Sequence, residues 1–399
     1  MILYDPAVIV NYRDYGIMLP IPSDRGKRVL EFLGGERPDS PECPVSPLYP
    51  VLDFKKAQIR LGIEGQILQR EDLERVHSEE YTARLYGKGL QTALLNAFEL
   101  IDARGRPNRY EPDRARRPLS DMFHTLIAQA GGTYLASLLA LQGSALPGDV
   151  PSGGKFTNES FCYYLGGGMH HARYDAPSGF CLINDAAIAA FKVISGKPVR
   201  LIWIIDMDAH KGDGTAELIH FARERGALRK PRRGQPEKAA RAERESGKYA
   251  QTERGKDKPC ILTLSIHMAK GWPLDSETIA SADRGRAPLL PSDVDIGIGS
   301  GEEDEYTARL AEGLRELERL SDYTPDLALV VDGADPYEHD GLPSSSLLRL
   351  TLEQCIKRDT HVFRYLQDRK IPSAWIQAGG YGDRAWEPPA HFLQAINNA

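Results

Sequence analysis

The chain has 399 residues, of which 41% are hydrophobic and 27% are charged, and its formal net charge is −6. These proportions are typical of a globular protein with a large core. The negative net charge argues against a nucleic-acid-binding protein, because such proteins present an excess of positive charge to phosphates.

The sequence also argues against a membrane protein. No run of residues approaches the length of about 18 apolar residues that a spanning helix needs, and the first residues lack the basic and apolar regions of a secretion signal. The five cysteines are widely spaced, without a CxxC pair. Such cysteines are typical of reduced thiols, so we expect a cytoplasmic protein.

The first third of the chain predicts mainly helices. Residues 2–4 favour a strand, and residues 23–32 favour a short capped helix. Helical spacing of apolar residues follows over 70–102 and 117–142. The intervening residues 102–117 are polar and rich in Arg, Pro and Asp, which predicts a surface loop. Surface loops near a site often carry specificity.

A glycine-rich segment provides the first indication of a site. Three glycines, 166–168, precede Met169, His170 and His171. Adjacent histidines in a strand would point to opposite faces, so both can serve one site only in irregular backbone. Glycines permit such backbone. A His-His pair alone is often incidental, and its significance depends on what else the chain brings near it.

The strongest indication of a site is the stretch 204–214, which follows an apolar run from 199 to 205. The run predicts a buried strand, and the residues after it include Asp206, Asp208, His210 and Asp213. Ligands of open α/β sheets gather at the carboxyl ends of the strands. Carboxylates and an imidazole there suit a divalent metal such as zinc. Helix capping would explain the aspartates but not the histidine.

The remaining chain alternates strands and helices. Apolar runs at 260–266, 327–331 and 374–377 predict buried strands, each followed by polar residues or glycines. This alternation indicates an α/β fold with a parallel sheet and helices on both faces. Residues 226–258 are instead basic and poor in aliphatic residues. They predict a solvated surface insertion, with an arm for an acidic partner or nucleic acid as the alternative.

Together the motifs GGGMHH with a following SGF, DMDAHKGDG, GAD before Asp340, and AGGYG resemble the histone deacetylase family over about residues 160–386. The resemblance implies an arginase/deacetylase fold, with a mostly parallel eight-stranded sheet and helices on both faces. It also implies a single catalytic domain over 1–399, with the basic insertion at about 226–258 on its surface.

The resemblance also implies the roles of the site residues. One zinc ion would be held by Asp208, His210 and Asp335, leaving open positions as a catalytic zinc requires. The expected catalytic residues are the general base His171 with Asp213 behind it, His170 backed by Asp206, and the oxyanion donor Tyr381. A structural potassium ion is expected beside the zinc, at Asp206, Asp208, His210, Ser265 and Ile266.

The family pocket is a narrow tube for an acyl-lysine side chain. The residues that match its walls are Gly179, Phe180, Trp272 and, at the gate position, Leu342. A leucine at the gate is similar to lysine deacylases, whereas acetylpolyamine specialists carry an acidic residue there. The acidic residue at the rim of the family pocket has no clear counterpart, and Asp113 is a candidate for it.

The resemblance therefore predicts a zinc-dependent amidohydrolase that removes acetyl or another acyl group from lysine side chains of proteins or peptides. The alternatives are a deacetylase of a small acylated amine such as an acetylpolyamine, or a long-chain deacylase. Lys211 departs from the family, in which a histidine usually follows the liganding histidine. The stretch Ala209-His210-Lys211 is more similar to class IV and bacterial members, some of which remove longer acyl groups, so a longer acyl group is an alternative to acetyl. No membrane or nucleic-acid partner is expected, and an oligomer is compatible with the sequence.

Three rivals remain. A binuclear manganese ureohydrolase such as arginase would need a metal ligand at position 212, where this chain has glycine. A catalytically silent reader of acyl-lysine would be expected to lack Tyr381, His171 or a metal ligand. In a third alternative the basic insertion docks nucleic acid and the pocket is secondary.

Overall fold

Eight parallel strands form one sheet in the part of the chain that the computed structural model describes, which is residues 1–34, 48–143, 160–231, 258–275 and 289–397. Their order across the sheet is β2-β1-β3-β8-β7-β4-β5-β6. The strands are β1 (Ile2–Leu3), β2 (Val51–Leu52), β3 (Phe161–Tyr164), β4 (Leu201–Asp206), β5 (Cys260–Met268), β6 (Val294–Ile298), β7 (Leu327–Asp332) and β8 (Ser373–Gln377). The predicted α/β architecture, with an eight-stranded parallel sheet and helices, is confirmed.

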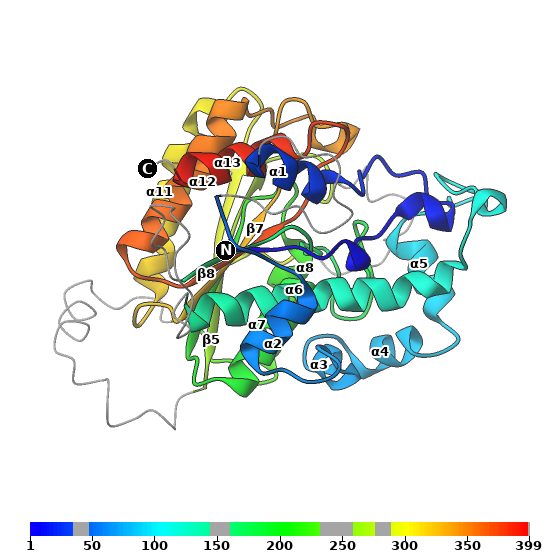
Figure 1. Ribbon diagram of the computed structural model, residues 1–399, viewed down its shortest axis with the longest axis horizontal. Helices are drawn as coiled ribbons and strands as arrows, with labels where there is room; N and C mark the ends of the chain where they lie inside the picture. The colour runs from blue at the N-terminus through cyan, green and yellow to red at the C-terminus, as the bar shows by residue number, and fades with distance from the viewer. Residues whose placement is uncertain (35–47, 144–159, 232–257, 276–288, 398–399) are drawn as a thin grey trace.

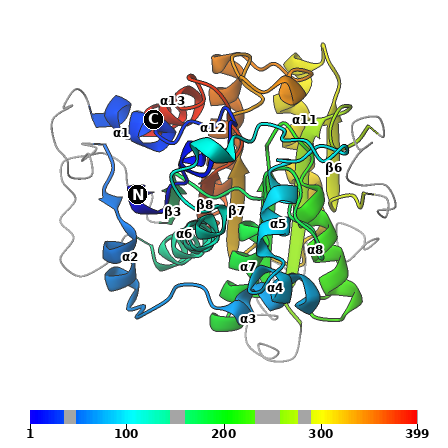
Figure 2. The same ribbon diagram turned by 90° about the vertical axis from the view of Figure 1, so that its right-hand side faces the viewer.

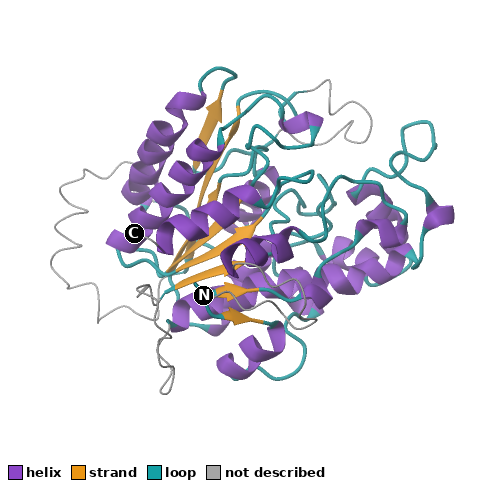
Figure 3. Cartoon of the chain, turned by 45° about the horizontal axis from the view of Figure 1, so that its top comes forward, coloured by secondary structure: helices purple, strands orange, loops and turns teal. Residues whose placement is uncertain are grey.

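Helices cover both faces of the sheet (Figures 1 and 3). On one face lie α2 (Phe54–Leu61), α6 (Met122–Gln142), α7 (Asp185–Gly196) and α8 (Asp213–Glu224). On the other lie α1 (Arg25–Gly34), α11 (Tyr306–Leu320), α12 (Leu352–Asp368) and α13 (Glu387–Asn397). The short helices α3 (Arg70–Glu74), α4 (Glu79–Leu85) and α5 (Leu90–Ala97) lie beside α6 and α7 (Figure 2).

The alternation of side chains along β4 explains the two layers. Ile202 and Ile204 belong to the core under α6 and α7, whereas Leu201, Trp203 and Ile205 belong to the core under α11 and α12. Successive side chains of a strand point to opposite faces, so a strand covered on both sides must be apolar throughout. All residues of β4 are buried.

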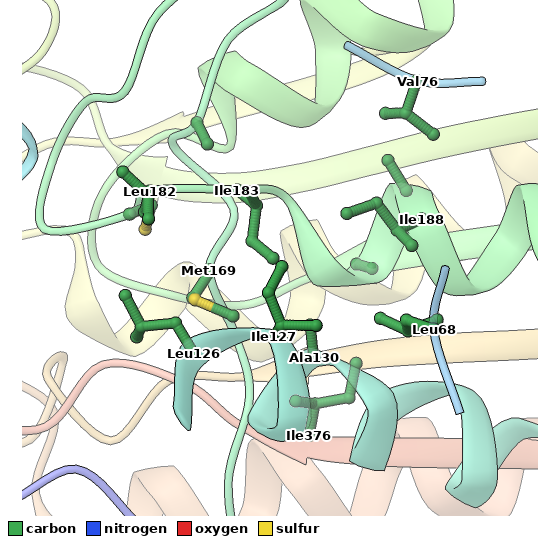
Figure 4. Packing of buried hydrophobic residues seen from close by; sticks show 14 of the residues in the cluster. Leu68, Val76, Leu126, Ile127, Ala130, Met169, Leu182, Ile183, Ile188 and Ile376 are labelled. Carbon is green, nitrogen blue, oxygen red and sulfur yellow. The ribbon is translucent and has the colours of Figure 1, made fainter. Parts of the chain in front are cut away.

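The glycine-rich segment is anchored by the same packing. Figure 4 shows Met169 against Leu126 and Ile127 of α6, with Ile183 and Ile376 nearby. Met169 is 6% exposed although it lies in a loop. A long unbranched side chain can fill irregular space, so the packing of Met169 helps to anchor this loop.

Several details differ from the sequence predictions. The predicted helix over 70–102 is divided into α3, α4 and α5. Strand β3 and strand β6 were not predicted, because one is short and aromatic and the other contains Gly297.

The described residues test other sequence-based expectations only in part. The basic insertion predicted at 226–258 lies outside the described residues except at its two ends. The described cysteines are free and buried. No helix in the described ranges combines the length and the apolar character that a membrane crossing requires.

Candidate active site

The candidate metal ligands converge where β4 and β7 end side by side. Asp208 and His210 follow β4, and Asp335 follows β7. One ligand atom from each lies within 4.8 Å of the others, and all three side chains are buried. Backbone groups orient the carboxylates: Ala209 N–H donates to Asp335 Oδ1 at 2.9 Å, and Gly379 N–H donates to Asp208 Oδ2 at 3.0 Å.

The charges of this group show that it suits a cation. Burial, followed by the neighbouring Asp208 carboxylate, raises the pKa of Asp335 to about 6. For His210, burial lowers the pKa, but the Asp208 and Asp335 carboxylates outweigh it and raise the pKa to about 10. Two buried carboxylates need a positive charge beside them. Two carboxylate oxygens and one imidazole nitrogen also match the donor set of catalytic zinc, so the residues fit that metal.

His170 and His171 lie beside this group, each backed by a carboxylate. His170 Nδ1 is 2.6 Å from Asp206 Oδ2, and His171 Nδ1 is 2.7 Å from Asp213 Oδ1. The two rings lie 3.9 Å apart between centroids. A carboxylate at Nδ1 fixes the tautomer, so that Nε2 is left as the proton acceptor of a neutral ring.

The two histidines differ in charge. Burial, followed by the positive charge of His170, lowers the pKa of His171 to about 4. Burial also lowers the pKa of His170, but the carboxylates of Asp206 and Asp208 outweigh it and raise the pKa to about 9. The surroundings therefore favour the charged form of His170 and the neutral form of His171.

The loop that carries the histidines is held by the start of α7. Asp185 accepts hydrogen bonds from Gly168 N–H at 2.9 Å and Met169 N–H at 2.7 Å. Asn184, the N-cap of α7, donates from its side-chain amide to the His170 carbonyl at 3.1 Å. Buried His77 accepts the Asn184 N–H at 3.1 Å. Sequence reasoning did not assign His77 or Asp185 a role, because neither lies in a recognisable motif.

The loop that carries Tyr381 is held from two sides. Asp340 accepts the Tyr381 N–H at 2.7 Å and the Leu342 N–H at 2.8 Å. Arg25, from α1, donates to the Ala378 carbonyl at 2.6 Å and the Gln377 carbonyl at 3.2 Å. Arg25 comes from a distant part of the chain, and no local pattern indicated its position. These contacts orient Tyr381, whose phenol is buried.

A cavity of about 430 Å³ leads to this group from outside, and we call it the outer cavity. It is lined by Pro20, Glu99, Arg109, His171, Gly179, Phe180, His210, Trp272, Leu342, Pro343, Ser344 and Tyr381. The predicted wall residues thus share one cavity. The Trp272 ring lies 4.5 Å from that of His171, edge to face, and the Phe180 ring lies 6.3 Å from that of Tyr381.

Gly179 is needed for the width of the outer cavity. Its φ is 52°, and a Cβ there would lie 2.3 Å from the Trp272 ring and 2.5 Å from the His171 ring. A smaller inner cavity of about 80 Å³ lies behind the site and includes Arg25, Met169, Cys181 and Tyr381 among its lining residues.

The residues expected to bind potassium lie at the ends of neighbouring strands. Asp206 pairs with Ser265 in the register of β4 and β5, and Ile266 follows. Ser265 Oγ accepts the Gly212 N–H at 3.2 Å. Lys211 forms an ion pair with Asp295, which also lies 3.0 Å from His267 Nε2. The side chain of Lys211 is thereby directed to Asp295.

Position 212 also bears on the arginase alternative. A Cβ on Gly212 would lie 2.3 Å from Asp206 Oδ2, so a side chain there would collide with the carboxylate behind His170. The site has no room for a second-metal ligand at this position.

The structure does not place Asp113, the candidate rim residue, in the outer cavity. Asp113 lies in a short 3₁₀ helix, Pro112–Arg114, and is not among the lining residues of the outer cavity. The carboxylate that lines it is Glu99, paired with Arg109 at 3.1 Å. The sequence indicated only that the loop near 102–117 was polar, and the docking of that loop depends on tertiary contacts.

Comparison with known proteins adds to this geometry. Residues 48–393 match the model of the histone deacetylase domain. An uncharacterised protein of Picosynechococcus sp. is 26% identical over 64% of this chain and 62% of its own length. Histone deacetylase 2 of Arabidopsis thaliana is 22% identical over 95% of this chain and 74% of its own length. The chain thus spans less than two thirds of the first of these relatives.

A solved structure has the same fold. The crystal structure of acetylpolyamine aminohydrolase from Burkholderia pseudomallei superposes with a TM-score of 0.56 and 19% identity, covering 99% of this chain and 98% of the other. Since the family model covers most of the sequence and the sheet has the expected architecture, this chain belongs to the histone deacetylase family.

Proposed function

We propose that this protein is a zinc-dependent amidohydrolase that removes an acyl group from the side-chain amine of lysine. The observation that supports this most directly is the position of the buried group Asp208, His210 and Asp335 beside His171, at the end of an aromatic-walled cavity of about 430 Å³. A cavity with apolar walls and a few convergent polar groups is typical of a substrate site.

A zinc ion bound by these three residues would supply a Lewis acid that polarises the amide carbonyl and lowers the pKa of water. His171 is the general base in this proposal. Its ring is neutral near pH 7, and Asp213 holds its Nδ1 so that Nε2 can accept the proton of the attacking water.

Two further groups complete the proposed mechanism. His170, protonated and held by Asp206, stabilises negative charge near the reacting carbonyl and can donate a proton to the leaving amine. Tyr381 donates its hydroxyl to the developing oxyanion. Burial, followed by the charges of Asp335 and Asp208, raises its pKa well above the ordinary value, so the phenol keeps its proton.

The residue at the gate position, Leu342, favours a lysine side chain over a polyamine. Phe180 and Trp272 provide apolar surface for the methylene stem, and Leu342 offers no charge to a second ammonium. The crystal structure of the acetylpolyamine aminohydrolase is similar in fold, so a small acylated amine is the alternative substrate. A long-chain acyl group is the second alternative. We also propose a structural potassium ion at Asp206, Asp208, His210, Ser265 and Ile266.

A series of acyl-lysine peptides from acetyl to myristoyl, together with acetylputrescine, tests the proposal when zinc is measured on the same preparation. We expect turnover of at least one acyl-lysine peptide, inhibition by a hydroxamate, and one zinc ion per chain. Asp335→Asn should abolish turnover and zinc binding, whereas Asp368→Asn, at an exposed position, should do neither. A preparation that is active without zinc, or that cleaves acetylputrescine alone, would contradict the proposal.

A further inference from the structure

The outer cavity opens beside two opposite charges. Apart from histidines, Glu99 and Arg109 are the only ionisable groups with a formal charge at neutral pH among its lining residues within the described chain. Arg109 donates to Glu99 Oε2 at 3.1 Å. The two side chains are 42% and 36% exposed, so both charges are accessible from solvent.

The backbone presents the pair together. Asn108 donates its N–H to the Leu100 carbonyl and its side-chain amide to the Glu99 carbonyl, both at 2.8 Å. The Phe180 N–H donates to the Ala97 carbonyl at 2.9 Å. These bonds close the loop between Glu99 and Arg109 and join it to the cavity wall.

The conformation of this region is unusual. Among the described residues, four that are not glycine have a positive φ, and three of them line the outer cavity: Glu99 at 52°, Arg109 at 52° and Phe180 at 63°. Left-handed backbone is unfavourable for residues with a Cβ, and such residues concentrate at ligand sites. The fold therefore keeps these residues in a backbone conformation that is locally unfavourable, and it places their side chains at the opening of the outer cavity.

The ion pair leaves donors available. The guanidinium of Arg109 lies 5.5 Å from the centroid of the Phe180 ring, and among the described residues it donates a hydrogen bond only to Glu99. An arginine has five N–H donors in a planar fork, which matches a carboxylate. An exposed ion pair contributes little to stability, so its members can exchange partners at small cost.

We propose that Glu99 and Arg109 form a binding site for the zwitterionic end of an α-amino acid. The substrate class is a free amino acid whose side-chain amine is acylated, such as Nε-acetyl-lysine. Its α-carboxylate binds Arg109, its α-ammonium binds Glu99, and its methylene stem lies between Phe180 and Trp272. This inference rests on the proposed function, since it assigns a substrate to the same site.

The chemistry of the substrate explains why both charges are needed. Polyamines carry only ammonium groups, and acyl-lysine within a protein carries neither α charge. A free acyl-lysine carries one charge of each sign on its α-carbon, joined by a four-carbon stem to the amide. Hydrolysis breaks the amide C–N bond, with water giving its oxygen to the acyl carbon and a proton to the amine, so acetate and lysine are formed.

Four acetylated compounds test the assignment by removing one charge at a time. Nε-acetyl-lysine has both charges, N-acetylcadaverine lacks the carboxylate, 6-acetamidohexanoate lacks the ammonium, and Nα-acetyl-Nε-acetyl-lysine methylamide lacks both. Each charge-assisted contact should change kcat/KM by about tenfold. Nε-acetyl-lysine should therefore be the best substrate, and the capped compound the poorest.

Variants assign each charge to a residue. Arg109→Gln should lower kcat/KM about tenfold for the two compounds that carry a carboxylate and much less for N-acetylcadaverine. Glu99→Gln should show the corresponding loss for the two compounds that carry an ammonium. Arg114→Gln is the matched control, because Arg114 pairs with Glu111 in the same loop region but does not line the outer cavity.

The outcomes separate this inference from the proposed function. If the capped compound or an acyl-lysine peptide is hydrolysed at least as well as free Nε-acetyl-lysine, the zwitterion site is overturned and the amidohydrolase remains. Equal losses for all four compounds in Arg109→Gln and Glu99→Gln would also overturn it. If none of the compounds and no acyl-lysine peptide is cleaved by zinc-loaded protein, the proposed function itself fails.

Discussion

The two ends of the outer cavity are built differently. At the closed end, Asp208, His210 and Asp335 are 4% exposed or less, and each is bonded to backbone or side chains of another segment. At the mouth, Glu99 and Arg109 are partly exposed and bonded chiefly to each other. Chemistry at the closed end needs fixed groups in a site that excludes water, whereas recognition at the mouth needs groups that can exchange partners.

The two ends of the outer cavity also differ in the structural elements that hold their residues. The closed end lies at the carboxyl ends of β4 and β7, strands that are buried on both faces. The mouth is made by loops after α5 and β3, where backbone of positive φ occurs. Substitutions at the closed end should therefore affect every substrate, while substitutions at the mouth should affect substrates selectively.

The largest effect is expected for His171→Ala at the closed end. Removing the proposed general base should lower kcat by about 10²–10⁴ for every acyl substrate, because proton transfer from water is lost. Zinc should remain bound, since His171 is not one of the proposed ligands. His220→Ala, at an exposed position, is the control, and activity that survives in His171→Ala would disprove its role.

Tyr381→Phe should have the next largest effect. The ring remains, but the hydroxyl that would stabilise the oxyanion is lost, so kcat should fall by about 10²–10³, equivalent to about 2.7–4 kcal/mol. KM should change little, because the hydroxyl acts mainly in the transition state. A variant that loses binding while kcat is preserved would place Tyr381 in the wall instead.

The support behind the closed end predicts a dependence of stability on pH. Burial lowers the pKa of His77 to about 4, from an ordinary value near 6.5. The unfolded chain therefore binds more protons than the folded chain in this window. Stability from this group is present above pH 6.5 and is lost as the pH falls through 4, by about 3 kcal/mol in total.

Urea unfolding between pH 7.5 and 4.5 measures this effect in wild type and in His77→Asn. The wild type should lose more unfolding free energy on acidification than the variant does. His220→Asn, which removes an exposed histidine, should behave like the wild type. Equal pH dependence in wild type and His77→Asn would show that His77 is not the responsible group.

The smallest effect is expected at the gate. Leu342→Glu adds a carboxylate to the mouth, where a second ammonium would meet it. We expect the ratio of kcat/KM for acetylputrescine to that for an acyl-lysine peptide to rise about tenfold, corresponding to about 1.4 kcal/mol. Leu342→Gln is the neutral control, and an equal rise in both variants would rule out the charge as the cause.

The sequence predicted the closed end much better than the mouth. Asp206, Asp208 and His210 are neighbours in the chain and follow a recognisable apolar strand, so their meeting requires only that the strand be buried. The pairing of β4 with β7 then brings Asp335 to them. For these residues, the local sequence pattern and the geometry of a parallel sheet are sufficient to predict that they meet.

The mouth depends on contacts that no local pattern encodes. Glu99 and Arg109 come together because Asn108 closes their loop and Phe180 N–H bonds to Ala97. Arg25 reaches the Tyr381 loop from α1, across most of the sequence. Strand β3 was not predicted for a similar reason. Its aromatic residues are buried in the core, but they do not show the alternation of apolar and polar residues that indicates a strand.

The proposed mechanism requires a single zinc ion at Asp208, His210 and Asp335 for amide hydrolysis. It is tested most directly by stripping the metal with a chelator, returning zinc in known amounts, and following bound zinc and hydrolysis of an acyl-lysine peptide together. Activity should rise in proportion to bound zinc, saturate at one ion per chain, and not return in Asp335→Asn. Full activity in the stripped protein, or zinc-restored activity in Asp335→Asn, would contradict it.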